Sequence, residues 1–279
     1  MDRRPIPEVR WLTELKTLID TRHQGKEAEQ LQLLSRLVFR PLLEDDEPDT
    51  EATAANRYGA LLGIWQYLQQ RDRKQTRIRV FNPDPERDGW RSAHSIIEIL
   101  MDDMPFIVAS CVTELQRQDV RVHQQTYPIF GAIRDDQGRL QQLRDEPGQD
   151  AEVETLVRFE IDHQISDDSL QHLETRLHQV LLDVRHAVED WTPMMEKVSE
   201  AADWCDQSDA CRSCADNPEA IALLRWLADE AFLFLGFRFY TAEKTEKGST
   251  GCGISQAAGS AASVSRSPRT SSASNWTST

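Results

Sequence analysis

The chain has 279 residues, enough for one large domain or two ordinary ones, and 39% of them are hydrophobic. It carries 47 acidic and 32 basic side chains, a formal net charge of −15, so nucleic acid and anionic lipid surfaces would be repelled. With seven Trp as well, this composition argues against overall disorder and against a nucleic-acid partner, and it indicates a globular protein.

Signals for a membrane or for secretion are missing from the sequence. No apolar run approaches the roughly 20 residues that cross a bilayer, and the start, Met1–Pro7, lacks the apolar core of a secretory signal. The five Cys are an odd number, which suits reduced thiols better than a disulfide framework. We therefore expect a cytoplasmic protein with no membrane partner.

Helical periodicity dominates the first part of the chain. Apolar residues recur at spacings of three and four within Glu8–Phe39, and the same spacing returns within Leu61–Leu68. Pro41 and the acidic stretch Glu44–Glu51 separate the two segments. The pattern predicts an α-helical N-terminal subdomain over residues 1–75.

The period changes at Arg77–Phe81, a β-branched and aromatic run that predicts a short strand. His94–Leu100 predicts a second strand, and Pro105–Gln118 predicts a helix. In Leu156–Ile161, the alternation of apolar and charged residues predicts a strand with one buried face. Extended segments are also expected over Val120–Ile133 and from Leu140 onward, with a turn at Asp136–Gly138.

A long helix is predicted to begin at Ser166 or Asp167, because apolar residues then recur with heptad-like spacing up to Val188. The order strand, helix, two or three strands, helix fits a split βαβ unit. We therefore predict an α+β protein whose residues 76–200 form a ferredoxin-like sandwich of helices and an antiparallel sheet.

Residues 201–247 are expected to open a third, incomplete unit. Asn217-Pro218-Glu219 predicts a helix start, and Phe232–Tyr240 predicts an extended segment. From Gly248 the chain is rich in Ser, Ala, Thr and Gly, so a disordered tail is expected over 248–279. A natural linker and a lost reading frame both account for this tail. We favour the second, because no partner strand is predicted after Phe232–Tyr240.

The strongest candidate site is the turn Asp102-Asp103-Met104-Pro105, which joins a predicted strand to a predicted helix. Free N–H groups at a helix start attract a carboxylate, so this turn is a candidate for binding an effector. The competing interpretation is structural: the two Asp cap the helix while Met104 and Phe106 pack beneath them.

Other motifs predict less. Cys205, Cys211 and Cys214 are a weak candidate metal site without an obvious fourth ligand, and the simpler interpretation is free thiols. Gly251-Cys252-Gly253 lacks the spacing of a dinucleotide-binding turn. The His residues are scattered over separate elements and suggest no catalytic triad. We therefore expect neither a catalytic site nor a bound cofactor in this chain.

Many short motifs occur between about residue 50 and residue 240, and their specificity lies in the order in which they follow one another. In chain order they are Arg79–Pro83, Asp88–Trp90, His94–Glu98, Asp102–Phe106, Arg134-Asp135 with Gly138, Glu160–Asp162, Asp183–Arg185, Asp190-Trp191 with Met194, Leu224–Leu227 and Phe234–Gly236. Together they resemble the N-terminal part of one family, the large bacterial NAD-specific glutamate dehydrogenases.

This resemblance implies an N-terminal, ACT-like region, a ferredoxin-like module that commonly binds amino acids or pairs with other copies. It also implies oxidative deamination of L-glutamate with NAD by a homo-oligomer whose catalytic domain lies downstream. No position here matches the catalytic motif, so no catalytic residue is carried over. Ala109 and Tyr127 depart from the family pattern, which puts a ligand role near Ala109 in doubt.

Three hypotheses follow from the sequence. The first is a regulatory or assembly segment of the dehydrogenase, whose partners are the downstream catalytic region, other subunits and an amino-acid effector. The second is a stand-alone ACT-like module that binds amino acids or proteins. The third, an unrelated small enzyme, lacks a nucleophile, base and stabiliser in one context.

Overall fold

A computed structural model describes residues 10–39, 53–146, 148, 151–208, 217–231, 239–244 and 250–256. The chain divides into two compact units, residues 1–181 and 182–279. The sequence placed its boundaries after residues 75, 200 and 247, whereas this division falls inside one long helix. The two units are described separately below.

Three helices open the first unit: α1 (Arg10–Arg22), α2 (Gly25–Phe39) and α3 (Ala54–Leu68). They confirm the helical periodicity, but the first predicted segment is interrupted where Gly25 adopts a positive φ of 56°. Thr53 caps α3, because its Oγ1 accepts a hydrogen bond from the backbone N–H of Asn56 at 3.2 Å.

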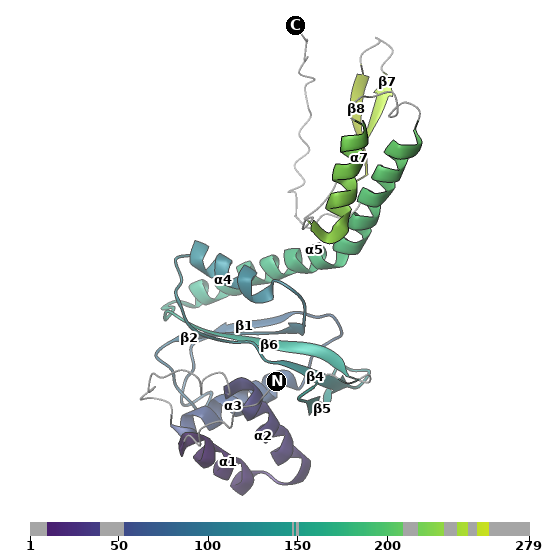
Figure 1. The fold of residues 1–279 in the computed structure, drawn as a ribbon. Coiled ribbons are helices and arrows are strands. Elements are labelled where there is room, and N and C mark those ends of the chain that lie inside the picture. Colours follow the sequence, from purple (N-terminus) through teal and green to yellow (C-terminus); the bar gives the residue numbers. More distant parts are fainter. Residues whose placement is uncertain are drawn as a thin grey trace. The chain divides into compact units, whose positions relative to one another are not determined.

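An antiparallel sheet follows, with strand order β1-β2-β6-β4-β5 and with β3 also paired to β6 (Figure 1). Helix α4 (Ile107–Arg117) connects β2 to β3, and α5 (Asp167–Gln207) follows β6. Ser166 Oγ accepts the Ser169 N–H at 3.2 Å, which caps α5 where the sequence predicts its start. The strands are β1 (Arg77–Phe81), β2 (Ser95–Asp102), β3 (Val122–Thr126), β4 (Ile129–Arg134), β5 (Leu140–Arg144) and β6 (Glu152–Ile161).

The connection β2-α4-β3 is a split βαβ unit, because β6 pairs antiparallel with both β2 and β3 and lies between them. Strand β1 precedes β2 in the chain, pairs antiparallel with it and forms one edge of the sheet. The extended segment Val120–Ile133 is two strands, β3 and β4, separated at Tyr127-Pro128. Gly138, with φ of 76°, forms the predicted turn before β5.

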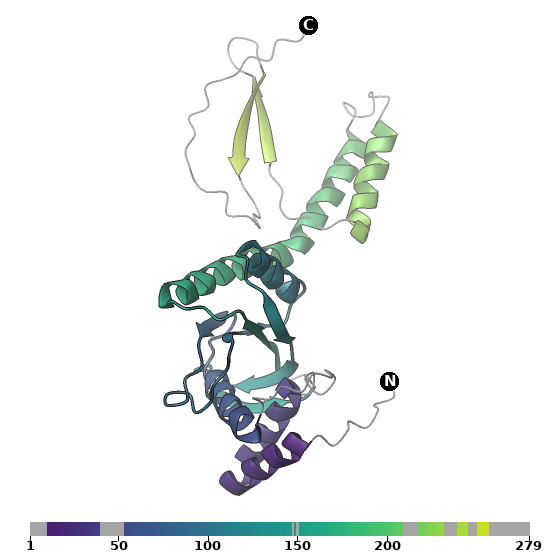
Figure 2. The same ribbon diagram turned by 90° about the vertical axis from the view of Figure 1, so that its left-hand side faces the viewer.

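Both faces of the sheet are covered (Figure 2). Odd-numbered residues of β2 and β6, such as Ile99 and Phe159, pack with α4 and the first part of α5. Even-numbered residues, such as Leu100 and Leu156, pack with α1–α3. The prediction of a single buried face for Leu156–Ile161 was therefore wrong, because the N-terminal helices form a second layer on the other face.

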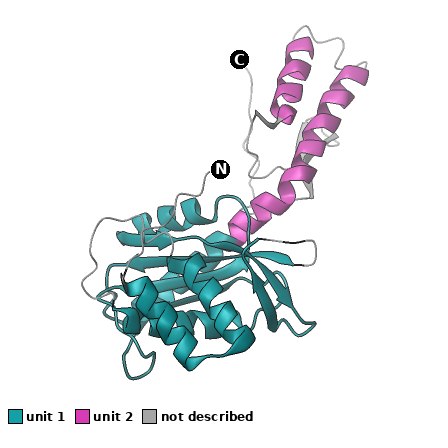
Figure 3. Cartoon of the chain, turned by 60° about the horizontal axis from the view of Figure 1, so that its bottom comes forward, with its two compact units in different colours: residues 1–181 teal, residues 182–279 magenta. Residues whose placement is uncertain are grey.

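The second unit contains the rest of α5, helix α7 (Asn217–Trp226) and a π-helical turn, Leu227–Ala231 (Figure 3). A two-stranded antiparallel sheet follows, β7 (Phe239–Lys244) with β8 (Thr250–Gln256). Of the predicted extended segment Phe232–Tyr240, only Phe239 and Tyr240 lie among the described residues, and both belong to β7. Strand β8 lies inside the predicted disordered tail and pairs with β7, so the prediction of disorder was wrong there. The Gly, Ser and Thr of β8 carry no apolar alternation, so only the backbone pairing reveals this strand. Residues 248–249 and 257–279 of the tail lie outside the described residues.

Candidate functional site

The predicted strand-to-helix turn forms where the sequence places it. Strand β2 ends at Asp102, and α4 begins at Ile107. Phe106 occupies the N-cap position with a left-handed φ of 72°, and no side chain caps the helix. This conformation is costly for a bulky residue, and about half of the Phe106 side chain is exposed. The N-cap of α4 therefore lies at the surface without a capping side chain, whereas Ile107, the first residue of the helix, is buried.

The side chain of Asp102 belongs to a buried ion cluster. It binds Arg71, whose side chain is completely buried and whose Nη1 lies 2.8 Å from Oε1 of Glu154. That second contact lacks hydrogen-bond alignment, so it is an ion pair only. Arg134 completes the cluster, with Nε and Nη2 at 2.6 and 2.8 Å from the two oxygens of Glu154. The Arg71 cluster, Arg71, Asp102, Arg134 and Glu154, thus balances two cations with two carboxylates.

Register explains why these carboxylates need two arginines. Asp102 and Glu154 are direct cross-strand partners on β2 and β6, so two like charges lie on the same face of the sheet. Arg71, in the loop after α3, reaches both of them and removes the repulsion. The Asp102 position is thereby committed to the packing between the sheet and α1–α3.

Asp103 is oriented differently. It accepts a hydrogen bond from the hydroxyl of Tyr127, and its own backbone N–H donates to the carbonyl of Val153 at 3.2 Å. Burial raises the pKa of Tyr127, and the Asp103 carboxylate raises that pKa further. The ring of Tyr127 packs against the core under α4 and α5, together with Met104. Asp102 and Asp103 therefore serve different faces of the sheet, and neither caps α4 as the structural interpretation predicted.

A second ion cluster, which the local sequence patterns did not predict, surrounds Glu98, four residues before Asp102 on β2. Glu98 is 1% exposed and accepts a hydrogen bond from Arg79 Nε at 2.8 Å. Arg158, its cross-strand partner on β6, holds Glu160 at 2.6 Å through Nη1. Charged residues inside otherwise apolar strands were the available signal. Their burial depends on α1–α3, which lie far away in the sequence.

The remaining candidates are dispersed. Cys205 is half-buried, while Cys211 and Cys214 lie outside the described residues. Among the residues that the structure describes, no group of three potential ligands can hold a metal ion. The backbone at Gly251-Cys252-Gly253 is part of strand β8, not a strand-to-helix turn.

Two His residues that looked unrelated in the sequence are brought together. The rings of His94 and His123 stack with centroids 4.2 Å apart, and His123 Nε2 lies 2.7 Å from Asp162 Oδ1. The hydrogen bond from His123 is the main cause of a lowered pKa of Asp162. Ser92 Oγ accepts a hydrogen bond from the backbone N–H of His94 at 3.0 Å, and this contact does not involve the His94 ring. Among the described residues, the two His rings therefore show no triad.

Cys111 is expected to be chemically inert. It is fully buried in α4, and burial raises the pKa of its thiol to about 12. The reactive thiolate is then roughly a thousandfold scarcer at pH 8 than for an unperturbed thiol. Alkylation of the native chain, followed by peptide mass spectrometry, should leave Cys111 unmodified, whereas the chain unfolded in urea should be labelled there. Equal labelling of Cys111 in the native and the unfolded chain would contradict this burial.

None of the helices in the described part of the chain has the length and apolar character that a membrane span requires. The class of the protein is set by its covered antiparallel sheet and split βαβ connection, which make it an α+β protein of ACT type. A family model described as "Glutamate dehydrogenase, ACT1 domain" matches residues 38–177. The chain therefore belongs to the glutamate dehydrogenase family that carries this domain.

Two curated relatives agree with this assignment. The NAD-specific glutamate dehydrogenase of Halomonas elongata is 34% identical over 235 residues, covering 82% of this chain and 14% of the relative. That of Pseudomonas aeruginosa is 32% identical over 238 residues, covering 84% and 15% respectively. The chain thus spans only about one seventh of the length of these relatives. The resemblance stated from the sequence motifs is confirmed.

Proposed function

We propose that the chain is the N-terminal regulatory and assembly segment of an NAD-dependent glutamate dehydrogenase. The reaction of that enzyme converts L-glutamate, NAD and water to 2-oxoglutarate, ammonia and NADH, and its catalytic residues lie outside this chain. The observation that carries the proposal is the match of this chain to the ACT1 domain model. It is joined by the alignment with two NAD-specific glutamate dehydrogenases, of which the matched region is only about one seventh. The segment binds the downstream catalytic region and other subunits.

The contacts of the charged groups support a role without chemistry. Glu98 and Glu154, fully buried carboxylates, are each bound by two arginines. A general acid or base must instead reach a substrate proton within hydrogen-bond distance. These acids hold the sheet together and are closed to a substrate, which suits a rigid module that positions other domains.

The deletion of this segment from a relative tests the proposal. We expect deletion of the region aligned to this chain to change the number of subunits in the assembled Halomonas elongata enzyme, its glutamate saturation curve, or both. Sedimentation velocity, corrected for the shorter subunit, and NADH formation measure the two quantities. An unchanged number of subunits together with an unchanged saturation curve would refute the proposal. The purified chain itself should form no NADH from glutamate and NAD, and detectable turnover would refute the absence of catalysis.

The proposal includes an amino-acid effector at the turn Asp102–Pro105. The uncapped start of α4 favours the ligand carboxylate. Asp103, half-buried and three residues before the N-cap, supplies a negative charge for the ammonium group. Calorimetric titration of the chain with amino acids should detect binding that Asp103→Asn weakens about tenfold or more. Asp136→Asn, in the turn before β5, is the matched control and should leave the affinity unchanged. A failure of all amino acids to bind would remove the effector from the proposal.

A further inference from the structure

The helices of the second unit form a hairpin with a thin core. Over residues 182–208 and 217–229, where side chains are described, its buried apolar residues are few. The contact between its two arms includes a hydrogen bond from Asn217 Nδ2 to the carbonyl of Cys205, at 3.3 Å. The buried residues are Met194, Met195, Ala202 and Ile221.

Large apolar side chains remain on the outside of this hairpin. Trp204, Leu223 and Trp226 are 63%, 55% and 53% exposed. Scattered apolar residues are common on protein surfaces, but two Trp on so small a unit are not. Exposed apolar surface of this kind, surrounded by polar residues, is typical of an interaction site.

A groove runs between α5 and α7 on one side of the hairpin. It consists of two adjoining hollows of about 500 and 440 Å³, which share Ser199 and Ala228 in their walls. Trp191 and Met195 line the first hollow, and Trp226 lines the second. Met195 is only 9% exposed, so the groove offers chiefly the two Trp side chains to an occupant.

The rim of the groove is acidic. Glu196, Glu200 and Asp203 line the first hollow, and the second is lined by Asp229 and by Arg225, which pairs with Asp206 at 3.2 Å. Lys197, 2.5 Å from Glu200, offsets part of this charge. Residues 182–207 of α5 contain seven acidic and two basic residues, so this arm is strongly negative. An occupant must therefore combine an apolar face with positive charge.

The negative charge of the groove rim distinguishes between the candidate occupants of the groove. A second copy of this chain, with a net charge of −15, would meet the acidic rim with repulsion, and so would an anionic lipid surface. An amphipathic helix fits instead, because its apolar stripe can cover the Trp and Met side chains while Lys and Arg meet the rim. Helix in groove is a common mode of recognition for surfaces of this size.

We propose that this hairpin groove binds a basic amphipathic helix from the downstream part of the same dehydrogenase polypeptide. The relatives extend far beyond the match, since it covers only 14–15% of their length, and a tethered helix is present at high effective concentration. The choice of a downstream helix as the occupant rests on the proposed assembly role. The preference of the groove for an apolar and basic occupant does not depend on that role.

The groove is tested on the complete 279-residue chain with a synthetic peptide. The probe is a labelled Leu/Lys helix of about 18 residues, five turns, with all Leu on one face. We expect binding by fluorescence anisotropy, and we expect the double substitution Glu196→Lys, Glu200→Lys to weaken it about tenfold or more. Asp167→Lys with Asp168→Lys makes the same charge change at the start of α5 and should leave the affinity within about twofold.

Two results would overturn the proposal that the groove binds an amphipathic helix. One is equal binding of a peptide with the same composition in scrambled order, because a built groove requires the apolar stripe. The other is an equal loss of affinity with both double substitutions, because general charge would then explain the binding. Circular dichroism of each variant verifies that the helices remain folded before affinities are compared.

The source of the helix is tested in the full-length Halomonas elongata enzyme by zero-length carbodiimide cross-linking, which joins carboxylates to Lys amines. We expect peptides aligned with residues 182–229 to be linked to Lys-containing peptides beyond the region that matches this chain. Links confined to the matched region would overturn the downstream source. If such links form while deletion of the segment changes neither assembly nor saturation, the proposed function fails and this inference stands. If no such links form while deletion of the segment does change assembly or saturation, the proposed function stands and this inference fails.

Discussion

Glu154→Ala is expected to lower the free energy of unfolding of the first unit by about 3–5 kcal/mol, because it leaves buried arginine charge without a partner. Glu154 is fully buried and holds both Arg71 and Arg134. Its removal leaves Asp102 as the only remaining carboxylate of the Arg71 cluster. Urea denaturation followed by circular dichroism measures the change.

A control for this substitution lies two residues away on the same strand. Glu152 pairs with Arg73 at 3.2 Å, but these side chains are 39% and 83% exposed. Solvent screens such a pair, so Glu152→Ala is expected to cost no more than about 1 kcal/mol. Similar losses for the two alanine variants would show that burial of the Arg71 cluster does not determine its contribution.

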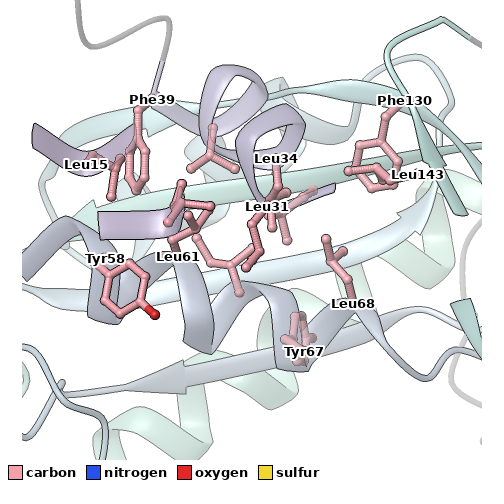
Figure 4. Packing of buried hydrophobic residues seen from close by; sticks show 14 of the residues in the cluster. Leu15, Leu31, Leu34, Phe39, Tyr58, Leu61, Tyr67, Leu68, Phe130 and Leu143 are labelled. Atoms are coloured by element: carbon pink, nitrogen blue, oxygen red, sulfur yellow. The ribbon is translucent and has the colours of Figure 1, made fainter. Parts of the chain in front are cut away.

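Phe130→Ala is expected to cost about 3–5 kcal/mol and to destabilise helices and sheet together. Phe130 is completely buried and belongs to the same core as Leu31 and Leu34 of α2 and Leu143 of β5 (Figure 4). If α1–α3 form a layer on the sheet, the backbone amides of α1–α3 and those of β2 and β6 must lose protection from hydrogen exchange at the same urea concentration.

Ile129→Ala is the matched control for this substitution. Ile129 precedes Phe130 on β4, points to the opposite face of the sheet and is 39% exposed. Its truncation should cost about 1 kcal/mol or less, since little buried volume is removed. A stable helical subdomain that outlasts the sheet in Phe130→Ala would contradict the shared core and favour independent helices.

Local patterns in the sequence predicted most elements of the fold. Apolar residues spaced three and four apart predicted α3, and β-branched runs predicted β1 and β2, because each such pattern describes a single element. Breaks were harder to place. Pro128 divides an apparently continuous extended segment into β3 and β4, and Gly25 divides an apparently continuous helix, since each interruption depends on backbone geometry at one residue.

The candidate site was located more reliably than its contacts. The sequence placed the turn Asp102–Pro105 between a strand and a helix, and the structure has it there. The partner of Asp102, however, is Arg71, in a loop 31 residues earlier, and that of Asp103 is Tyr127, 24 residues later. Such pairings follow from the sheet register and from the second helical layer, neither of which a local pattern reveals.

The buried charges and the net charge play separate roles. The Arg71 cluster contains two cations and two carboxylates, so it adds nothing to the net charge of −15. The excess negative charge therefore lies elsewhere, including the acidic arm of the hairpin. In the proposed function, the neutral cluster belongs to the module that positions other domains, and the acidic arm belongs to the surface used in assembly.

An exchange of the first unit between enzymes tests the account most directly. In the Halomonas elongata dehydrogenase, the region aligned with residues 1–181 is replaced by those residues of this chain. Assembled mass and glutamate-dependent NADH formation are then compared with those of the parent enzyme and of the enzyme lacking the region. We expect the hybrid to assemble and turn over like the parent enzyme, whereas the enzyme lacking the region should not. A hybrid that behaves like the deletion, or a deletion that behaves like the parent, would contradict it.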